Sequence, residues 1–303
     1  MYVGAVNALA DVAAELERLL GAPLADPTPL DGGITNRNYL LDTAAGQVVV
    51  RRPGKDTSLL GIDRAAEIAA SRAAASLGIA PELVGLAGEC LVTRYIPGSS
   101  LDDGQAAEHV DVLGRDLRRF HGCGAELPAD FRVPDLLARY EQVVRERGGR
   151  PPAAYGRARE IAAQVARALR PARAVPCHND LLPGNILRAQ DGALMIVDWE
   201  YAGMGDARFD LGNLAVNNHL DEDAEARLLA AYDGAPPQAQ RRAELTLMKL
   251  MSDAREAAWG VVQAHVSELD FDFDGYAGEH LDRLLAAAAA PSYRRALALS
   301  AGV

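Results

Sequence analysis

Three polar side chains near the middle of the chain have the types and spacing that phosphoryl transfer requires. Asp180 and Asn185 stand on either side of a Pro-Gly turn, and Asp198 ends the apolar run LMIVD further along the chain. Phosphoryl transfer needs a carboxylate that orients or deprotonates a hydroxyl, and oxygen ligands for a Mg²⁺ ion that bridges the phosphates. Asp180 meets the first need, and the side-chain oxygens of Asn185 and Asp198 can reach the same place. The combination favours a phosphotransfer site over a capped turn beside a strand end.

The elements that must position these residues form two groups along the chain. Apolar, β-branched runs predict strands in the first part, with an alanine-rich helix between them. After Pro97 the pattern is mostly helical, interrupted around 174–198 by a strand-like pair that carries the polar residues. We therefore expect an α+β fold with a small β-rich lobe over 1–97 and a larger helical lobe over 98–303. The expected strands are 38–41, 47–52, 83–86 and 90–96, and the expected helices are 63–77, 102–122, 134–147, 153–170, 222–233, 238–266 and 276–288.

Composition and charge exclude several classes of protein. With 303 residues, 49% of them hydrophobic and 24% charged, the chain can bury a sizeable core. Its net charge of −11 argues against nucleic acid as a partner, because phosphate binding needs a basic surface. No membrane helix is expected, and residues 1–20 are typical of an amphipathic helix rather than a signal peptide. Cys90, Cys123 and Cys177 are too sparse for a disulfide framework, which predicts reduced thiols and a cytoplasmic protein.

The central motif carries a resemblance to a known family. The segments HNDLLPGNIL and IVDWEYAGMGDARFDLGNL resemble the choline/ethanolamine kinase branch of the aminoglycoside-phosphotransferase-like small-molecule kinases. The segment GGITNRNY resembles the family's phosphate-covering loop, VRRPG its third strand, and LVTRYIPG the connection between its lobes. The segments SDAREAAWG and SELDFDF resemble the C-terminal part of bacterial choline kinase-like members. The resemblance implies a protein-kinase-like fold and dependence on ATP and Mg²⁺.

The resemblance also assigns roles to individual residues. Asp180 is expected to be the catalytic base, and Asn185 and Asp198 are expected to be the Mg²⁺ ligands. His178 is expected to brace the catalytic loop rather than to act as the base. The expected ATP-binding residues are Gly32, Gly33, Thr35 and Asn36 in the phosphate-covering loop, Arg51, which pairs with Glu67, and Arg94 and Ile96, whose backbone faces adenine.

The strand cation differs from that of most kinases. Protein kinases and antibiotic phosphotransferases use a lysine at the phosphate-contacting position, whereas this strand carries Arg51 and Arg52, and Lys55 comes only after Pro53-Gly54. The choline branch accepts arginine there, so the difference supports that branch. A guanidinium can hold phosphate oxygens through two parallel hydrogen bonds and stays charged. Of the two arginines, Arg51 is expected to contact phosphate and Arg52 to be a solvated strand residue.

The acidic segment after Asp198 is the expected substrate side. Aromatic faces and carboxylates hold small cations such as a quaternary or primary ammonium, and the acidic excess of the chain is concentrated in this segment. Two alternatives stay open, because Trp259 can instead belong to the core and Glu200 can instead support the metal ligands. The candidates are the aromatic residues Tyr201, Trp259 and Tyr276 and the acidic residues Glu200, Asp253 and Glu256.

The sequence therefore predicts an ATP-dependent phosphotransferase that acts on the hydroxyl of a small cationic amino alcohol, most simply choline or ethanolamine. A kinase of the same fold for an aminoglycoside, a thiamine-like cation or an amino sugar is an alternative, and a nucleotide-binding pseudokinase is another. The run Asp270–Gly275 opens like a calcium-binding EF-hand loop, but Leu281 stands where such a loop requires a glutamate. Calcium binding is not expected there, and the oligomeric state stays open.

Overall fold

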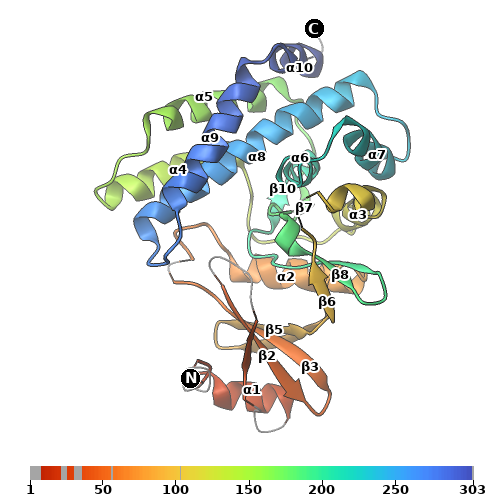
Figure 1. The fold of residues 1–303 in the computed structure, drawn as a ribbon, viewed down its shortest axis with the longest axis vertical. Coiled ribbons are helices and arrows are strands. Elements are labelled where there is room, and N and C mark those ends of the chain that lie inside the picture. The colour runs from red at the N-terminus through yellow and green to blue at the C-terminus, as the bar shows by residue number, and fades with distance from the viewer. Residues whose placement is uncertain (1–7, 22–25, 31–35, 56, 103, 302–303) are drawn as a thin grey trace.

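The smaller lobe of the protein is built on an antiparallel sheet, and the larger lobe is mostly helical (Figure 1). The expected two-lobed α+β architecture is therefore confirmed. Gly32, Gly33 and Thr35, which we expect to cover the phosphates, lie outside the described residues. The computed structural model describes residues 8–21, 26–30, 36–55, 57–102 and 104–301.

The strands of the small lobe follow the order β1-β2-β3-β5-β4, and all neighbours are antiparallel. Successive side chains of β3 point to opposite faces of the sheet. Val48 and Val50 are fully buried in the core shared with α1 (Ala13–Leu20), whereas Val49 and Arg51 line a cavity on the other face. The sheet thus directs Arg51 toward the larger lobe. The strands are β1 (Thr28–Leu30), β2 (Arg37–Thr43), β3 (Gly46–Arg52), β4 (Leu83–Ala87) and β5 (Cys90–Arg94).

Helix α2 (Arg64–Ser76) comes early in the chain but shares the core of the larger lobe. Its N-cap is Asp63, whose side chain accepts hydrogen bonds from two backbone N–H groups of the first turn. Ala66, Ala70 and Ala74 recur at helical spacing and are fully buried in a hydrophobic cluster of the larger lobe. In Figure 1, α2 lies between the sheet and the other helices, so it forms the layer where the two lobes meet.

The larger lobe is assembled around α8 (Ala239–Val266), whose middle turns are buried on every side. This helix contacts α4, α5, α6, α9 and α10. Two small sheets, β10-β7 and β6-β8-β9, hold the loops that carry the polar residues. The other helices of this lobe are α3 (Ala106–His121), α4 (Val133–Glu146), α5 (Ala153–Ala168), α6 (Ala207–Asn217), α7 (Glu222–Asp233), α9 (Phe273–Ala289) and α10 (Pro291–Ala301), and its strands are β6 (Gly98–Ser100), β7 (Val175–Cys177), β8 (Ile186–Ala189), β9 (Leu194–Ile196) and β10 (Gly203–Gly205).

The contact between α6 and α8 is very close at Gly212. A Cβ atom on Gly212 would lie 2.5 Å from the Cβ of Met248 and 2.6 Å from its carbonyl carbon. We expect Gly212→Ala to force the helices apart and to lower the free energy of unfolding in urea by about 1–3 kcal/mol. The control is Gly156→Ala on α5, where nothing lies within 4 Å of the added Cβ. At Gly156 the better helix propensity of alanine is expected to raise the free energy of unfolding by about 0.5–1 kcal/mol. Equal stability of the two variants would contradict the close approach of α6 and α8 at Gly212.

Several elements lie outside the expected ranges. The helix α6 is buried on nearly all its faces, so it lacks the polar stripe that marks an amphipathic helix in a sequence. The helix α10 and the strands β1 and β10 were also unexpected. Directly after Pro97, residues 98–100 form β6, which pairs with β8. Among the described helices, none combines the length and the hydropathy that crossing a bilayer demands.

Candidate active site

Two left-handed backbone conformations shape the loops that carry the polar residues. Asn179, directly before Asp180, has a φ of 69°, and Asp198 has a φ of 61°. Such conformations are costly for residues other than glycine, and they cluster at functional sites. The chain therefore turns sharply at the two points where the carboxylates of Asp180 and Asp198 are presented.

His178 joins the catalytic loop to the strand that precedes Asp198. Its ring is fully buried, with Nε2 at 2.9 Å from the carbonyl oxygen of Val197, and the backbone N–H of Asp180 donates to Nδ1 at 3.1 Å. Because Nδ1 accepts, we assign the ring proton to Nε2 and treat the ring as neutral. Burial lowers the pKa of His178, which agrees with that assignment. The contacts of the ring are those expected of a residue that braces the catalytic loop.

Asp180 is held at both carboxylate oxygens. Its Oδ1 accepts a hydrogen bond from Nη1 of Arg255 at 2.9 Å, and its Oδ2 accepts one from Nδ2 of Asn185 at 3.1 Å. Only 7% of Asp180 is exposed. Burial is the dominant influence and raises the pKa of Asp180 to about 7, although Arg255 acts in the opposite direction. A carboxyl group of this kind can exchange a proton near neutral pH.

Asn185 and Asp198 have the donor chemistry of a magnesium site. Asn185 ends the 3₁₀ turn Pro183–Asn185, Asp198 follows β9, and both line a cavity of about 380 Å³. The side-chain NH₂ of Asn185 donates to the backbone oxygen of Asp180 at 2.8 Å and to its Oδ2, which leaves the amide Oδ1 as an acceptor. An amide oxygen and a carboxylate are the hard ligands that Mg²⁺ prefers. The residues present therefore fit this ion.

Arg51 connects the sheet to α2 and to the strand that ends at Asp198. Its guanidinium forms ion pairs with Glu67, Asp198 and Glu200, the last at 3.4 Å. Glu67 is fully buried and also pairs with Arg64. The structure thus contains the Arg51–Glu67 pair that the resemblance implies.

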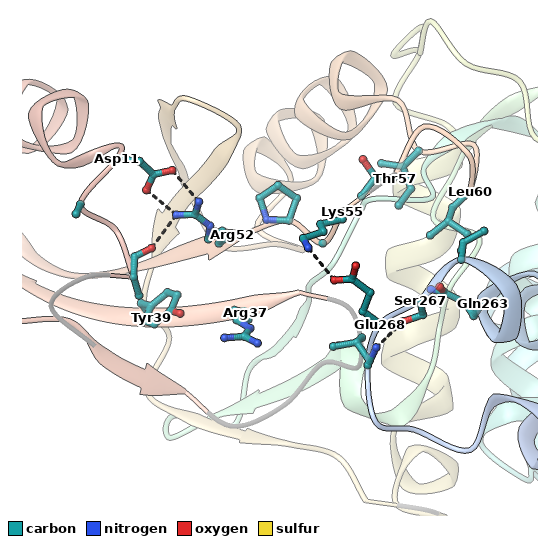
Figure 2. Close-up of a pocket in the computed structure, with 17 residues that line it drawn as sticks. Asp11, Arg37, Tyr39, Arg52, Lys55, Thr57, Leu60, Gln263, Ser267 and Glu268 are labelled. Atoms are coloured by element: carbon teal, nitrogen blue, oxygen red, sulfur yellow. Dashed lines mark hydrogen bonds and ion pairs between the residues drawn. The ribbon is translucent and has the colours of Figure 1, made fainter. Parts of the chain in front are cut away.

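Its neighbour Arg52 faces the other side of the sheet. The Arg52 side chain is partly exposed and forms two hydrogen bonds of 2.7 Å with the carboxylate of Asp11, as Figure 2 shows. The two arginines therefore separate as expected, although Arg52 has a partner at the surface.

Glu200 lies with the phosphate and metal candidates rather than with Trp259. Its Oε2 accepts a hydrogen bond at 3.0 Å from Nδ2 of Asn36, which also reaches Asp198 at 3.4 Å. Burial raises the pKa of Glu200, and the nearby charge of Asp198 adds to this effect. The geometry supports the alternative in which Glu200 stabilises the metal ligands, and it places Asn36 beside them.

The connection between the lobes forms one wall of the 380 Å³ cavity. Arg94, Tyr95 and Ile96 all line it. The backbone N–H of Arg94 donates to Glu82 and that of Tyr95 donates to Gln47, so both are used within the lobe. Among the described residues, the N–H of Ile96 has no such acceptor, which makes it the better candidate for a hydrogen bond to adenine.

The predicted substrate residues Tyr201, Trp259, Tyr276 and Glu256 form one buried cluster. The indole N–H of Trp259 donates to the hydroxyl of Tyr201 at 2.8 Å, and the rings of Trp259 and Tyr276 meet edge to face at 5.4 Å. The hydroxyl of Tyr276 donates to Oε2 of Glu256 at 2.9 Å. Trp259 and Tyr201 belong to the hydrophobic core, which agrees with the core interpretation of Trp259, and its contact with a substrate stays a prediction.

Asp253 has partners of its own one turn before this cluster. Its Oδ1 accepts a hydrogen bond from Nε of Arg283 at 2.7 Å and lies 3.2 Å from Nδ1 of His280. These contacts balance its charge within the helical lobe. Of the three predicted acidic residues, only Glu256 joins the aromatic side chains.

Asp210 on α6 holds the backbone of the catalytic loop. The sequence did not predict a role for this residue. Its Oδ1 accepts from the N–H of Asn179 at 2.7 Å, and its Oδ2 accepts from the N–H of His178 at 2.8 Å and contacts Nε2 of His121 at 2.9 Å. The ligand atoms of His121, Cys177 and Asp210 lie within 4.8 Å of one another, but the carboxylate is already occupied by these bonds. We therefore assign the group to bracing. An aspartate placed between the apolar residues Phe209 and Leu211 is the signal that marks it.

A second cavity, of about 880 Å³, lies between the small lobe and the end of α8 (Figure 2). It is bounded by β2 and β3 on one side and by the end of α8 on the other. Lys55, from the connection after β3, pairs at 2.7 Å with Glu268, from the connection after α8, and both side chains are largely exposed. An exposed pair contributes little to stability, so this ion pair by itself connects the two loops only weakly across the cavity.

The similarity to known proteins extends over both lobes. The phosphotransferase enzyme family matches residues 26–245. Probable choline kinase 1 of Arabidopsis thaliana is 25% identical over 315 residues, which cover 90% of this chain and 88% of that protein. The crystal structure of a choline/ethanolamine kinase family protein from Mesorhizobium loti has a TM-score of 0.79 at 28% identity, over 96% of this chain and 100% of that chain. The structure of LicA in complex with AMP has a TM-score of 0.76 at 26% identity, over 91% and 96% of the two chains.

Proposed function

We propose a function on the premise that this chain belongs to the phosphotransferase enzyme family. Within that family it is a small-molecule kinase related to choline and ethanolamine kinases. Our proposal is that it transfers the γ-phosphoryl group of ATP to the hydroxyl of a small cationic amino alcohol, such as choline or ethanolamine. The observation that carries the proposal is one cavity lined by Asn185, Asp198 and the Arg51–Glu67 pair, with the Asp180 carboxylate hydrogen-bonded to Asn185 at its edge.

Asp180 is the group that acts on the acceptor hydroxyl. Because Arg255 and Asn185 hold its two oxygens, the orientation of the carboxylate is set before a substrate binds. With a pKa near 7, Asp180 can accept the hydroxyl proton at neutral pH. In the loose transition state of phosphoryl transfer, positioning of the hydroxyl contributes more than strong base catalysis.

The phosphate charge is met by oxygen ligands and by a guanidinium. Asn185 and Asp198 would hold Mg²⁺, which supplies electrostatic stabilisation of the charge on the transferred group. Arg51 presents a permanent positive charge that can contact two phosphate oxygens at once. Glu67 holds this guanidinium from α2, as a glutamate on the corresponding helix holds the strand lysine in protein kinases.

The charges around Asp180 favour a cationic substrate. Asp180 and Glu256 share the single guanidinium of Arg255, so the buried group has more negative than positive charge when both carboxylates are ionised. The hydroxyl of Tyr276 is hydrogen-bonded to Glu256, and the ring of Trp259 packs against that of Tyr276. A cation beside such rings gains about 0.5–2 kcal/mol per contact. A substrate with one positive charge and one hydroxyl suits both features.

The proposal is tested with purified protein, Mg-ATP and a panel of acceptors, with ADP release as the measurement. We expect turnover of choline, ethanolamine or a close relative, and no turnover of the neutral carbon analogue of choline. Removal of Mg²⁺ with EDTA is expected to abolish the reaction. Turnover restricted to an aminoglycoside, a thiamine-like cation or an amino sugar would contradict the amino alcohol, and tight ATP binding without turnover of any acceptor would indicate a pseudokinase.

A further inference from the structure

Arg255, in the middle of α8, is the largest fully buried side chain among the described residues. Its Nη1 donates to Oδ1 of Asp180 at 2.9 Å and to Oε2 of Glu256 at 2.8 Å, and its Cζ lies 4.4 Å from the centre of the Tyr201 ring. Burial of a charge is costly unless the charge is paired and hydrogen-bonded. A well-packed apolar side chain would avoid that cost, so the guanidinium calls for an explanation beyond packing.

The relation of Arg255 to Asp180 supplies the explanation. Among the described residues, the ion pair with Arg255 is the only one that Asp180 forms. Arg255 reaches Oδ1 from α8, and Asn185 reaches Oδ2 from the turn that follows the catalytic loop. A carboxylate held at both oxygens from two separate elements cannot rotate freely about its side-chain bonds. The longest helix of the larger lobe therefore sets the angle at which Asp180 meets a hydroxyl.

We propose that Arg255 is a positioning residue for phosphoryl transfer, which fixes the Asp180 carboxylate and supplies its counter-charge. The inference rests on the proposed function and deepens it. The guanidinium also occupies a face of Tyr201 and one side of Glu256, which were both assigned to the substrate from the sequence. In this arrangement Tyr201 serves Arg255, and recognition of the substrate cation falls to the other members of the cluster.

A positioning role and a purely structural role lead to different results. If Arg255 only stabilised the fold, a folded variant without it would keep its kcat. If it positions Asp180, the variant loses kcat while the KM for ATP changes little, because Arg51 and the metal ligands are untouched. A small guanidinium compound in solution would then fill the space left by the side chain and restore part of kcat.

The experiment compares Arg255→Ala with the matched control Arg241→Ala. Arg241 also lies over a tyrosine ring, that of Tyr232 at 5.7 Å, and also pairs with two carboxylates, those of Asp233 and Glu244. It stands in the first turn of α8, about 20 Å along the helix from Arg255. We expect Arg255→Ala to lower kcat about 100-fold, and methylguanidinium to restore kcat about tenfold in a saturable manner. The control is expected to keep wild-type kcat and to gain nothing from methylguanidinium.

A second variant covers the case in which Arg255→Ala does not fold, since that change leaves two buried carboxylates without a counter-charge. The double variant Arg255→Met/Glu256→Gln removes one charge of each sign and keeps the net charge of the group. We expect it to lose kcat about 100-fold as well, and Arg255→Lys, a point charge without the planar fork, to lose less. Wild-type kcat in the double variant, or a folded Arg255→Ala that does not respond to methylguanidinium, would overturn the positioning role.

Failure of this inference can be distinguished from failure of the proposed function. Every variant is also assayed for the slow hydrolysis of Mg-ATP by water, which involves Asp180 but no amine. If the wild-type protein hydrolyses ATP but phosphorylates no amino alcohol, the proposed substrate class is wrong. The role of Arg255 is then tested on the rate of ATP hydrolysis, where the same loss is expected. If an amino alcohol is phosphorylated and the Arg255 variants match the wild type, only the inference about Arg255 fails.

Discussion

Replacement of Asp180 by asparagine is expected to lower kcat about 10³-fold while ATP affinity stays within about a factor of three of the wild-type value. Asparagine has nearly the same shape as aspartate, but it cannot accept the hydroxyl proton or balance the charge of Arg255. Arg51 and Asp198 are left unchanged, and Asn185 keeps its 2.8 Å hydrogen bond to the backbone oxygen of residue 180, so the expected nucleotide contacts are largely preserved. Steady-state kinetics with coupled ADP detection measures kcat, and calorimetric titration measures the affinity for the nucleotide.

The matched control for this change is Asp191→Asn. Asp191 lies at the exposed turn between β8 and β9, where its carboxylate accepts a hydrogen bond from the N–H of Ala193 at 3.0 Å. An asparagine oxygen can accept the same bond, so kcat is expected to remain at the wild-type value. An Asp180→Asn enzyme that keeps about a tenth of its kcat or more would remove Asp180 from the centre of the proposed chemistry.

Replacement of Asp210 by asparagine is expected to damage both stability and catalysis. The buried carboxylate accepts from the backbone N–H groups of His178 and Asn179, and the second of these residues is held in a left-handed conformation. An asparagine presents one NH₂ group, which must face a donor and leave it unsatisfied. We expect the free energy of unfolding in urea to fall by about 2–4 kcal/mol, and kcat to fall about 100-fold as the loop that carries Asp180 loosens.

The pH dependence of stability provides an independent check on Asp210. Burial acts to raise its pKa, but the hydrogen bond with His121 and the N–H donor of His178 outweigh this effect and hold the pKa below its usual range. A depressed pKa stabilises the fold above the unfolded value of about 4 and ceases to do so as the pH falls through the lower folded value. The stability difference between the wild type and Asp210→Asn is therefore expected to narrow below about pH 4. Asp116→Asn, at a partly exposed pair with Arg119, should change stability by less than about 0.5 kcal/mol.

The grouping of the candidate catalytic residues could be predicted from the sequence because they are local to one another. Asp180 and Asn185 lie in one short loop, and Asp198 closely follows β9, which pairs with β8, the strand directly after Asn185. Spacing along the sequence therefore determines most of their relative geometry. The strand arginine and its glutamate are further apart, but the fold implied by the resemblance brings β3 next to α2.

The residues that hold the site could not be found in this way, because they come from distant helices. Arg255 and Asp210 reach the catalytic loop from α8 and α6. A charged side chain in a helix ordinarily indicates a solvated face, and only the folded structure shows that Arg255 pairs with Asp180 and that Asp210 contacts His121 inside the core. The same burial removes the amphipathic pattern that would have marked α6 as a helix.

The substrate side was the least predictable part of the molecule. Its aromatic and acidic residues come from the loop after β9, from α8 and from α9, so their grouping depends on how three distant segments meet. The grouping of Tyr201, Trp259, Tyr276 and Glu256 follows from the packing of those helices. Their roles in binding a substrate stay predictions, and so does the role of Asp253.

The packing of α2 into the larger lobe has a consequence for the opening of the cleft. Since the alanine face of α2 is buried with that lobe, an opening of the cleft would separate the five-stranded sheet and α1 from α2 and the larger lobe. The contacts of Arg51 with Glu67, Asp198 and Glu200 all join the sheet to the part that contains α2 and the larger lobe. The rate of product release would then depend on how strongly Arg51 is held by these buried ion pairs rather than on the stiffness of the connection at 95–97.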